Sequence, residues 1–202
     1  SPSNILYQGG IMAINLSKGD KINFSKDNPG LQKIRIGLSW DAKPGITADL
    51  DASIFLLGDN EKLIGDEGII FYNNQDSSDG AVHHHGDNRD GSADGDDETI
   101  SIDLNKVGQT VKSLLIVLTS YADEGKEKIN FGRVKNATAR LYDESSGKVL
   151  NEFDLSEDMS DATSMEMVKI YRHNGEWKLG AIGEKVGSSI NGLSDVYNKY
   201  SK

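Results

Sequence analysis

Apolar side chains recur at every second position through much of this chain, which is the spacing of a β-strand with one buried face. The alternation runs through residues 33–40, 52–56 and 100–104. Residues 114–118 are instead continuously apolar, as expected for a central strand that is buried on both faces. The dominant period is therefore that of a β-sheet, and a fold built mainly from helices is excluded.

Turn-forming residues separate these segments, and further extended segments follow them. The turn signals are Asn28-Pro29-Gly30, Ser145-Ser146-Gly147 and Asn174-Gly175. The later extended segments are 137–142, 149–153, 165–171 and 177–182. Many short strands at this spacing predict an all-β fold, a sandwich or a barrel, and argue against a βαβ fold. A sandwich with Greek-key-like connections is the architecture we expect.

Only the C-terminus has helical periodicity. Ile190, Leu193, Val196 or Tyr197, and Tyr200 recur three to four positions apart, after Ser188-Ser189 as candidate caps. We expect a short C-terminal helix whose apolar stripe packs against the sandwich.

The length of 202 residues fits one domain of ordinary size. We expect residues 1–11 to be a disordered cloning leader before a natural start at Met12, and residues 12–202 to form a single calcium-binding domain. No run of about 18 apolar residues is present, so no membrane-spanning helix is expected.

The net charge of -10 argues against direct binding of nucleic acid, which needs clustered Lys and Arg to displace counterions. Cysteine is absent, which excludes disulfides, thiolate metal sites and a cysteine nucleophile. This fits a reducing cytoplasm, the location we expect, and fits a cysteine-free secreted protein equally well. An acidic protein attracts cations, so a metal ion is the expected ligand.

The segment 86–98 concentrates that acidity, with three glycines and a single Arg among its residues. Its carboxylates are Asp87, Asp90, Asp94, Asp96, Asp97 and Glu98. A second pair, Asp49 and Asp51, begins another strand, where the two side chains share a face about 6–7 Å apart. Calcium takes six to eight oxygen ligands, and the crowded charges repel one another unless a cation neutralises them. A calcium site is therefore predicted, with a solvated acidic loop as the alternative.

Two other segments partly match known metal-binding motifs. Residues 87–98 have the length of an EF-hand loop, but Arg89, Gly91 and Ser92 stand where that loop requires oxygen ligands and then glycine. On a strand, His83 and His85 would share a face and could bind zinc or nickel. The alternative for residues 83–85, including His84, is a surface strand end, and this is the interpretation we favour.

Seven motifs in order along the chain carry a family resemblance. They are Leu16-Ser17-Lys18-Gly19, Gly37-Leu38-Ser39-Trp40-Asp41, Asp49-Leu50-Asp51-Ala52-Ser53, Phe71-Tyr72-Asn73-Asn74, Gly86-Asp87-Asn88, Gly95-Asp96-Asp97-Glu98 and Tyr171-Arg172-His173-Asn174-Gly175-Glu176-Trp177-Lys178. Together they resemble the TerD-type tellurium-resistance (general stress) family, over Met12 to about Gly183. The resemblance implies a calcium-binding β-sandwich of two sheets and a role in cytoplasmic bacterial stress responses.

With the acidic segments, the resemblance implies a set of metal ligands. They are Asp49, Asp51, Asn73, Asp87, Asn88, Asp94, Asp96, Asp97 and Glu98. We expect one shared cluster of two calcium ions if a Greek-key crossover brings the Asp49 and Asp87 segments together, and two separate sites otherwise. Ser92 and Ala93 replace an acid and a glycine that the family usually carries, which predicts an altered affinity.

The expected function is a non-catalytic calcium-binding module with no organic cofactor and no catalytic residues. It would scaffold other stress-response proteins, including partners at the membrane face. The alternative is a metal-dependent hydrolase or phosphotransferase, with two metals about 3.5–4 Å apart in the same cluster. A Gly-rich phosphate loop, a Ser-His-Asp arrangement and a basic clamp beside the acids are all missing from the sequence.

Overall fold

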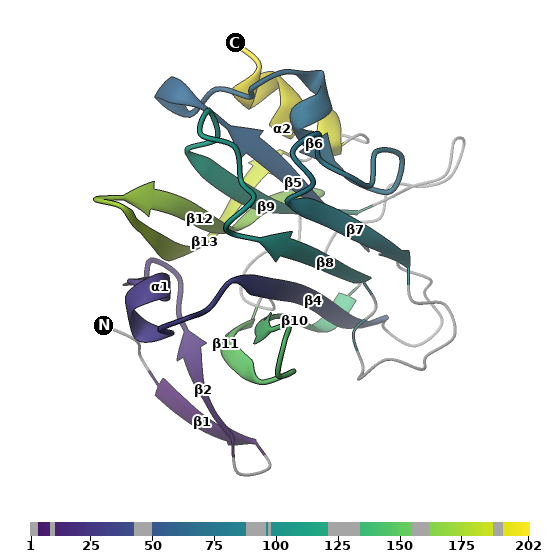
Figure 1. Cartoon of the computed structure of the whole chain (residues 1–202). Helices are drawn as coiled ribbons and strands as arrows, with labels where there is room; N and C mark the ends of the chain where they lie inside the picture. The colour runs from purple at the N-terminus through teal and green to yellow at the C-terminus, as the bar shows by residue number, and fades with distance from the viewer. Residues whose placement is uncertain are drawn as a thin grey trace.

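A computed structural model describes residues 4–8, 11–42, 50–87, 96, 98–120, 134–154, 162–187 and 192–202. Their strands form two stacked sheets, shown in Figure 1. The first sheet has seven strands, in the spatial order β1 (Asn4–Gln8), β2 (Ile11–Leu16), β11 (Val149–Asp154), β10 (Val134–Asp143), β4 (Lys33–Ala42), β8 (Glu98–Asp103) and β7 (Val82–Asp87). The second has six, in the order β3 (Lys21–Ile22), β13 (Glu176–Gly187), β12 (Ser164–His173), β9 (Ser113–Ser120), β5 (Leu50–Leu57) and β6 (Ile69–Ile70).

The helical elements are short. They are α1 (Phe24–Asp27), the 3-10 turns η1 (Asp59–Glu61) and η2 (Asp66–Gly68), and the C-terminal α2 (Gly192–Tyr200). The predicted all-β sandwich with a short C-terminal helix is confirmed. None of the helices that the structure describes has the length and apolar character needed to span a membrane.

The chain crosses repeatedly between the two sheets. It passes from β4 to β5, returns from β6 to β7, crosses again from β8 to β9 and back to β10, and crosses once more from β11 to β12. The described strand pairs are antiparallel, apart from β2 with β11, which is parallel. These crossings are the Greek-key-like connections that the sequence predicted.

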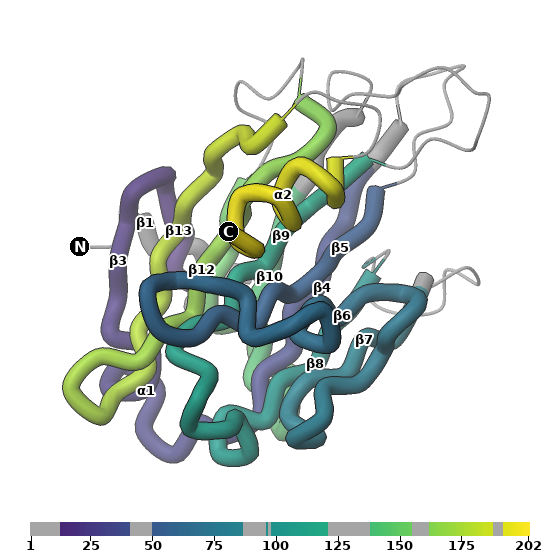
Figure 2. The backbone as a smooth tube through the Cα atoms, turned by 90° about the horizontal axis from the view of Figure 1, so that it is seen from above, coloured from purple at the N-terminus to yellow at the C-terminus, as the bar shows by residue number. Residues whose placement is uncertain are grey.

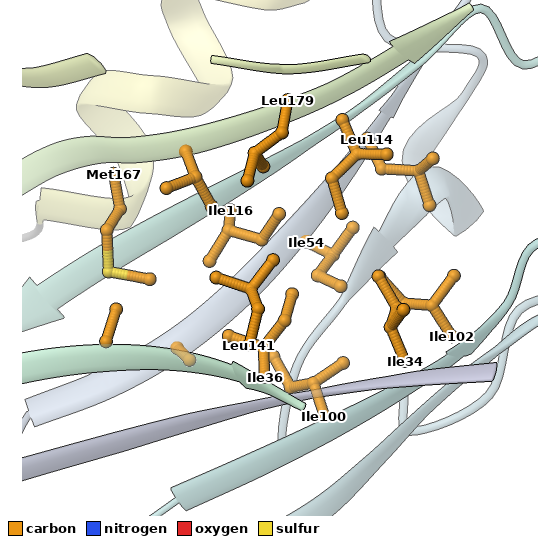
Figure 3. Close-up of a cluster of buried hydrophobic side chains, with 14 of the residues drawn as sticks. Ile34, Ile36, Ile54, Ile100, Ile102, Leu114, Ile116, Leu141, Met167 and Leu179 are labelled. Carbon is orange, nitrogen blue, oxygen red and sulfur yellow. The ribbon is translucent and has the colours of Figure 1, made fainter. Parts of the chain in front are cut away.

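The inward faces of the two sheets form the main core, shown in Figure 3. Ile34, Ile36 and Ile100 of the first sheet pack toward Ile54 and Ile116 of the second. All five side chains are at most 1% exposed. Burying one such side chain stabilises the fold by about 1.5–3 kcal/mol, so this period-two pattern is the main source of stability.

The outer face of the second sheet is partly covered by α2, as Figure 2 shows. Leu115 and Val117 of β9 turn away from the main core and pack in a second cluster with Val196 and Tyr200 of the helix. Every residue of β9 is buried. The prediction of a central strand buried on both faces, with the helix packed on the sandwich, is confirmed. Ile190 and the candidate caps Ser188-Ser189 lie outside the described residues.

The N-terminal segment differs from the expectation of a disordered leader over residues 1–11. Residues 4–8 form β1, which pairs antiparallel with β2 from Asn4 opposite Asn15 to Gln8 opposite Ile11. The physical reason is that β2 pairs with β11 on its other side, which leaves an edge of unsatisfied backbone groups that an extended segment can bond. Sequence composition carries no signal for such an edge.

Several strands begin or end at one end of the sandwich, which we call the acidic end. In the first sheet Ala42 lies opposite Val134, and Asp87 opposite Glu98. In the second sheet Leu50 lies opposite Ser120, next to the start of β12. The segments that carry the predicted ligands are therefore attached to the same end of the fold.

Candidate functional site

Glu98 and Ala52 connect the two sheets at the acidic end. Glu98 lies opposite Leu38 of β4, so its side chain points inward with the core residues. It is only 1% exposed, and its Oε2 accepts a hydrogen bond from the backbone N–H of Ala52 at 3.0 Å. The start of β5, which contains Asp51, thus lies directly against the start of β8, which follows the acidic segment.

The edge of β5 explains why Ala52 needs this contact. Its neighbour β6 pairs only with Ile54 and Phe55, so Ala52 lies beyond the reach of that short strand. Glu98 satisfies the Ala52 N–H, and Nε2 of His84 lies 3.1 Å from the Ala52 carbonyl oxygen. Two side chains of the first sheet therefore replace a missing strand, because buried backbone groups must find partners.

His84 is held in one orientation by its own strand. Its Nδ1 accepts a hydrogen bond from the N–H of Gly86 at 3.0 Å, so the ring proton lies on Nε2, 2.5 Å from Glu98 Oε1. Gly86 can do this because a bulge between His84 and Asp87 gives it φ +77°, a left-handed conformation that favours glycine. Burial lowers the pKa of His84, but the hydrogen bond to Glu98 and the charge of that carboxylate outweigh burial and raise it.

Asp96 lies on the opposite, outer face of the first sheet. Its carboxylate covers Gly37 of β4, where an added Cβ would come within 2.2 Å of Asp96 Oδ2. Tyr142 donates its hydroxyl proton to Oδ2 at 2.9 Å, and Nη1 of Arg140 lies 3.8 Å from Oδ1. Only glycine at position 37 leaves space for this carboxylate, which is 5% exposed.

The environment of Asp96 keeps its partners protonated. Burial and the charge of Asp96 raise the pKa of Tyr142, so the phenol remains a hydrogen-bond donor. Burial lowers the pKa of Arg140, but its hydrogen bond to Glu152 and the charge of that carboxylate outweigh burial and raise it. Arg140 Nε donates to Glu152 Oε1 at 2.8 Å. Asp96 is therefore fixed by a donor network on the outer face.

The other predicted ligands are spread around the same end. Asp51 is half-buried and alternates with the inward-facing Ala52, so it lies on the outer face of the second sheet. Asn73 is exposed in a turn that Phe71 and Asn74 close with reciprocal backbone hydrogen bonds. Asp87 ends β7, opposite Glu98. Asp49, Asn88, Asp94 and Asp97 lie outside the described residues.

Within the described part of the chain, no group of three or more His, Cys, Asp or Glu side chains could hold a metal ion. Asp96 and Glu98 cannot meet at one ion without rearrangement, since they lie on opposite faces of the first sheet. The ligand set as a whole stays a prediction, because four of its nine members lie outside the described residues.

The two outer histidines lie on the exposed face of β7. Nδ1 of His83 lies 2.7 Å from Asp76 Oδ1, and Nε2 of His85 lies 2.6 Å from Ser101 Oγ. Their rings meet edge to face, with centroids 4.6 Å apart. Burial and the nearby positive charges of His83 and Arg35 lower the pKa of His85. Nδ1 of His83 and Nε2 of His85 are thus engaged by Asp76 and Ser101, which favours the surface strand end over a zinc or nickel site.

Comparison with known proteins identifies the family to which this chain belongs. The family model of the TerD domain matches residues 12–200. The chain belongs to the TerD family.

Its TerD-family relatives include tellurium-resistance and stress proteins. The tellurium resistance protein TerD of Serratia marcescens is 42% identical over 191 residues, which cover 94% of this chain and 97% of that protein. General stress protein 16U of Bacillus subtilis is 41% identical over 175 residues, covering 85% and 90% of the two chains. The crystal structure of a homologue of telluride resistance protein (TerD) from Streptomyces coelicolor A3(2) shares the fold, with a TM-score of 0.64 at 18% identity over 82% of this chain and 96% of that one.

The sequence analysis did not identify two residues of this candidate site, His84 and Gly37. His84 was grouped with its neighbours as a surface residue, although Val82 two positions earlier marks the same inward face. The sequence analysis assigns Gly37 no structural role of its own, although this glycine interrupts the outward-facing polar row of Arg35 and Ser39. An alternating strand that carries one glycine on its polar face is a signal for close approach by another segment.

Proposed function

We propose that this TerD-family chain binds calcium at the acidic end and acts as a non-catalytic module of the tellurite and general stress response. The contact between Glu98 and Ala52 carries the proposal, because it joins β8, which begins at the end of segment 86–98, to β5, which begins at Leu50 and contains Asp51. Carboxylates far apart in sequence are thereby attached to a single end of the fold.

The charge balance at the acidic end supports the binding of a cation. Segment 87–98 contains six carboxylates and one Arg. Asp96 already accepts a hydrogen bond from Tyr142, and Glu98 already accepts hydrogen bonds from His84 and from the backbone N–H of Ala52. The remaining carboxylates would repel one another unless an ion neutralised them. Calcium fits this demand, since it accepts a variable set of carboxylate, amide and backbone oxygens.

The described geometry suggests two roles among the candidate ligands. Asp96 and Glu98 anchor the segment to the two faces of the first sheet, and their further lone pairs can still contribute to an ion. Asp49, Asp51, Asp87, Asn88, Asp94 and Asp97 would supply the other oxygens, with Asn73 at the margin. We propose that two calcium ions bind when Asp96 and Glu98 attach the acidic segment to the two faces of the first sheet.

The biological role follows from the family. Relatives of this chain bear the names tellurium resistance protein and general stress protein. We propose that this chain acts in the same responses in the cytoplasm, as a calcium-dependent scaffold for other stress-response proteins, including partners at the membrane face. Calcium would order the acidic end and so create the surface that a partner recognises.

Calorimetric titration of chelator-treated protein with calcium, and then with magnesium, tests the proposal. We expect about two calcium ions with dissociation constants on the order of 10⁻⁷–10⁻⁵ M, and much weaker binding of magnesium, which demands strict octahedral geometry. Asp97→Asn should weaken calcium binding, and Asp90→Asn should change it little. Equal affinity for both ions, or turnover of a generic phosphoester that Asp97→Asn abolishes, would favour the metal-dependent hydrolase instead.

A further inference from the structure

A groove of about 390 Å³ lies on the outer face of the second sheet, beside the part that α2 covers in Figure 2. Its lining includes Lys21 of β3, Lys169 and Tyr171 of β12, Gly180 of β13, and Lys112 before β9. We call it the basic groove. None of these residues belongs to the acidic end.

Strand register explains why the sheet is open at this place. Lys21 lies opposite Gly180, and Gly180 lies opposite Lys169, so the two lysines flank a glycine in one cross-strand row. A Cβ at Gly180 would have its nearest neighbours at 3.9 Å, on Tyr171, and at 4.0 Å, on Lys21. The glycine therefore leaves a gap between two cationic side chains, with the ring of Tyr171 at its margin.

The basic groove concentrates positive charge in a chain of net charge -10. Its lining carries the lysines Lys21, Lys112 and Lys169 against the single acid Glu61. Among the described residues, Lys21 makes no ion pair, and Lys112 Nζ donates only to the carbonyl oxygen of Gln109 at 3.1 Å. Like charges gathered at this density repel one another, and they favour an anion between them.

Arg172 borders the basic groove, but it follows Tyr171 in β12 and pairs with Trp177, so its side chain points to the inner face of the sheet, away from the gap at Gly180. Its guanidinium donates to the carbonyl oxygens of Val107, Gly108 and Val111, at 2.9, 3.3 and 3.0 Å. It also stacks over the ring of Trp177, 4.4 Å from the ring centroid. These contacts hold the cation without neutralising it, since carbonyl groups carry no net charge.

Glu61, the one acid in the lining of the basic groove, forms an ion pair with Lys169. It does so from an unfavourable backbone conformation, because Asn60 and Glu61 have φ values of 59° and 54°, in the left-handed region that residues with a Cβ avoid. Strain of this kind persists where a surrounding structure enforces it and is often found at ligand sites. The strained turn brings an internal anion to the position that an external anion would occupy.

We propose that the basic groove binds a small molecule carrying phosphate groups, and that this ligand displaces the Glu61 carboxylate from Lys169. Several cations around one gap match a multiply charged anion better than a single carboxylate. The volume lies in the range of small-molecule sites, about 300–1,000 Å³. The site is separate from the calcium proposal and does not depend on it.

Calorimetric titration of chelator-treated protein with inorganic pyrophosphate tests the groove without metal at the acidic end. We expect saturable binding that weakens with added salt. Lys21→Gln and Lys169→Gln should each weaken it roughly tenfold, the loss expected for a hydrogen bond to a charged group. Glu61→Gln keeps the shape of the side chain, removes the competing charge, and should tighten binding. Tighter binding of ADP than of pyrophosphate would assign the site to a phosphorylated organic metabolite, and equal binding to the free anion.

The matched control is Lys148→Gln, which removes a lysine from the exposed turn between β10 and β11 of the other sheet. It should leave pyrophosphate binding unchanged, and melting curves verify that each variant is folded. The proposal is overturned if no saturation occurs below millimolar pyrophosphate, if Lys148→Gln weakens binding as much as Lys169→Gln does, or if Glu61→Gln weakens it.

Discussion

Asp96 and Glu98 are separated by one residue, yet their carboxylates lie on opposite faces of the first sheet. Asp96 covers Gly37 on the outer face, and Glu98 reaches inward to Ala52 of the second sheet. The acidic segment is thus attached to the sheet at its C-terminal end from both sides. This attachment makes several outcomes measurable.

Gly37→Ala should destabilise the protein by about 1–3 kcal/mol, the usual cost of forcing atoms into a packed site. The new methyl group would come within 2.2 Å of Asp96 Oδ2 and expel the carboxylate from its position. Denaturant unfolding measures the loss. Gly180→Ala is the matched control, because its nearest neighbour would lie at an ordinary 3.9 Å. Equal stability of the two variants would show that Asp96 is not held over Gly37.

Glu98→Ala should cost about 3–5 kcal/mol of unfolding free energy, the penalty of breaking a buried pair. The change leaves the Ala52 N–H and the His84 Nε2–H without their carboxylate acceptor. The loss should appear in chelator as well as in calcium, because the contact belongs to the protein itself. Glu144→Ala, which removes a half-exposed partner of Arg35, should cost less than about 1 kcal/mol. A Glu98→Ala variant as stable in chelator as wild type would refute the inward contact.

Asp79→Asn should destabilise the protein by about 1–2 kcal/mol at neutral pH. Burial raises the pKa of Asp79, but hydrogen bonds from Ser77, Gly108 and Ala81 outweigh burial and lower it. A carboxyl group whose pKa is lower in the folded state contributes stability above its unfolded value of about 3.9. That contribution disappears as pH falls through the folded pKa.

Unfolding measured at pH 7 and again below pH 4 checks the Asp79 prediction. The stability difference between wild type and Asp79→Asn should narrow on acidification. Asp59→Asn, an exposed change in η1, should show no difference at either pH. A difference that stayed constant with pH would mean that the charge of Asp79 has no role.

Tyr200→Phe should destabilise the attachment of α2 by about 1–3 kcal/mol, because it removes a donor from a buried acceptor. The Tyr200 hydroxyl bonds to the carboxylate of Glu166, which is 4% exposed, and Lys199 pairs with the same group. Tyr197→Phe, which removes an exposed hydroxyl from Asp66, should have little effect. Hydrogen exchange of the α2 amides compares the two variants directly. Equal protection in both would argue that Glu166 does not hold the helix.

Much of the fold could be predicted from the sequence, because period-two alternation dictates which residues face inward. Ile34, Ile36 and Ile54 are assigned to strands on that basis, and Ile116 by the continuous apolar run of residues 114–118; all four lie in the core. The strand at residues 4–8 could not be predicted, because it depends on an open edge of β2 that exists only in the assembled sheet. Pairing between distant segments is a tertiary property that local patterns do not encode.

The crowding of acids in 87–98 singles out this segment in the sequence, and the structure places Glu98, at the start of β8, against Ala52 of β5. Whether the segment binds metal stays a prediction. The sequence could not show that Asp96 and Glu98 face opposite ways, because Asp96 precedes the regular part of β8 and folds over Gly37. The inward position of His84 likewise depends on the bulge at Gly86.

The melting temperature measured in calcium and in chelator tests the central claim most directly. If calcium binds only the folded protein, saturation at about a hundred times the dissociation constant adds roughly 2.7 kcal/mol per site. The melting temperature should therefore rise in calcium, fall again with chelator, and respond much less to magnesium. An unchanged melting temperature at millimolar calcium would contradict the account.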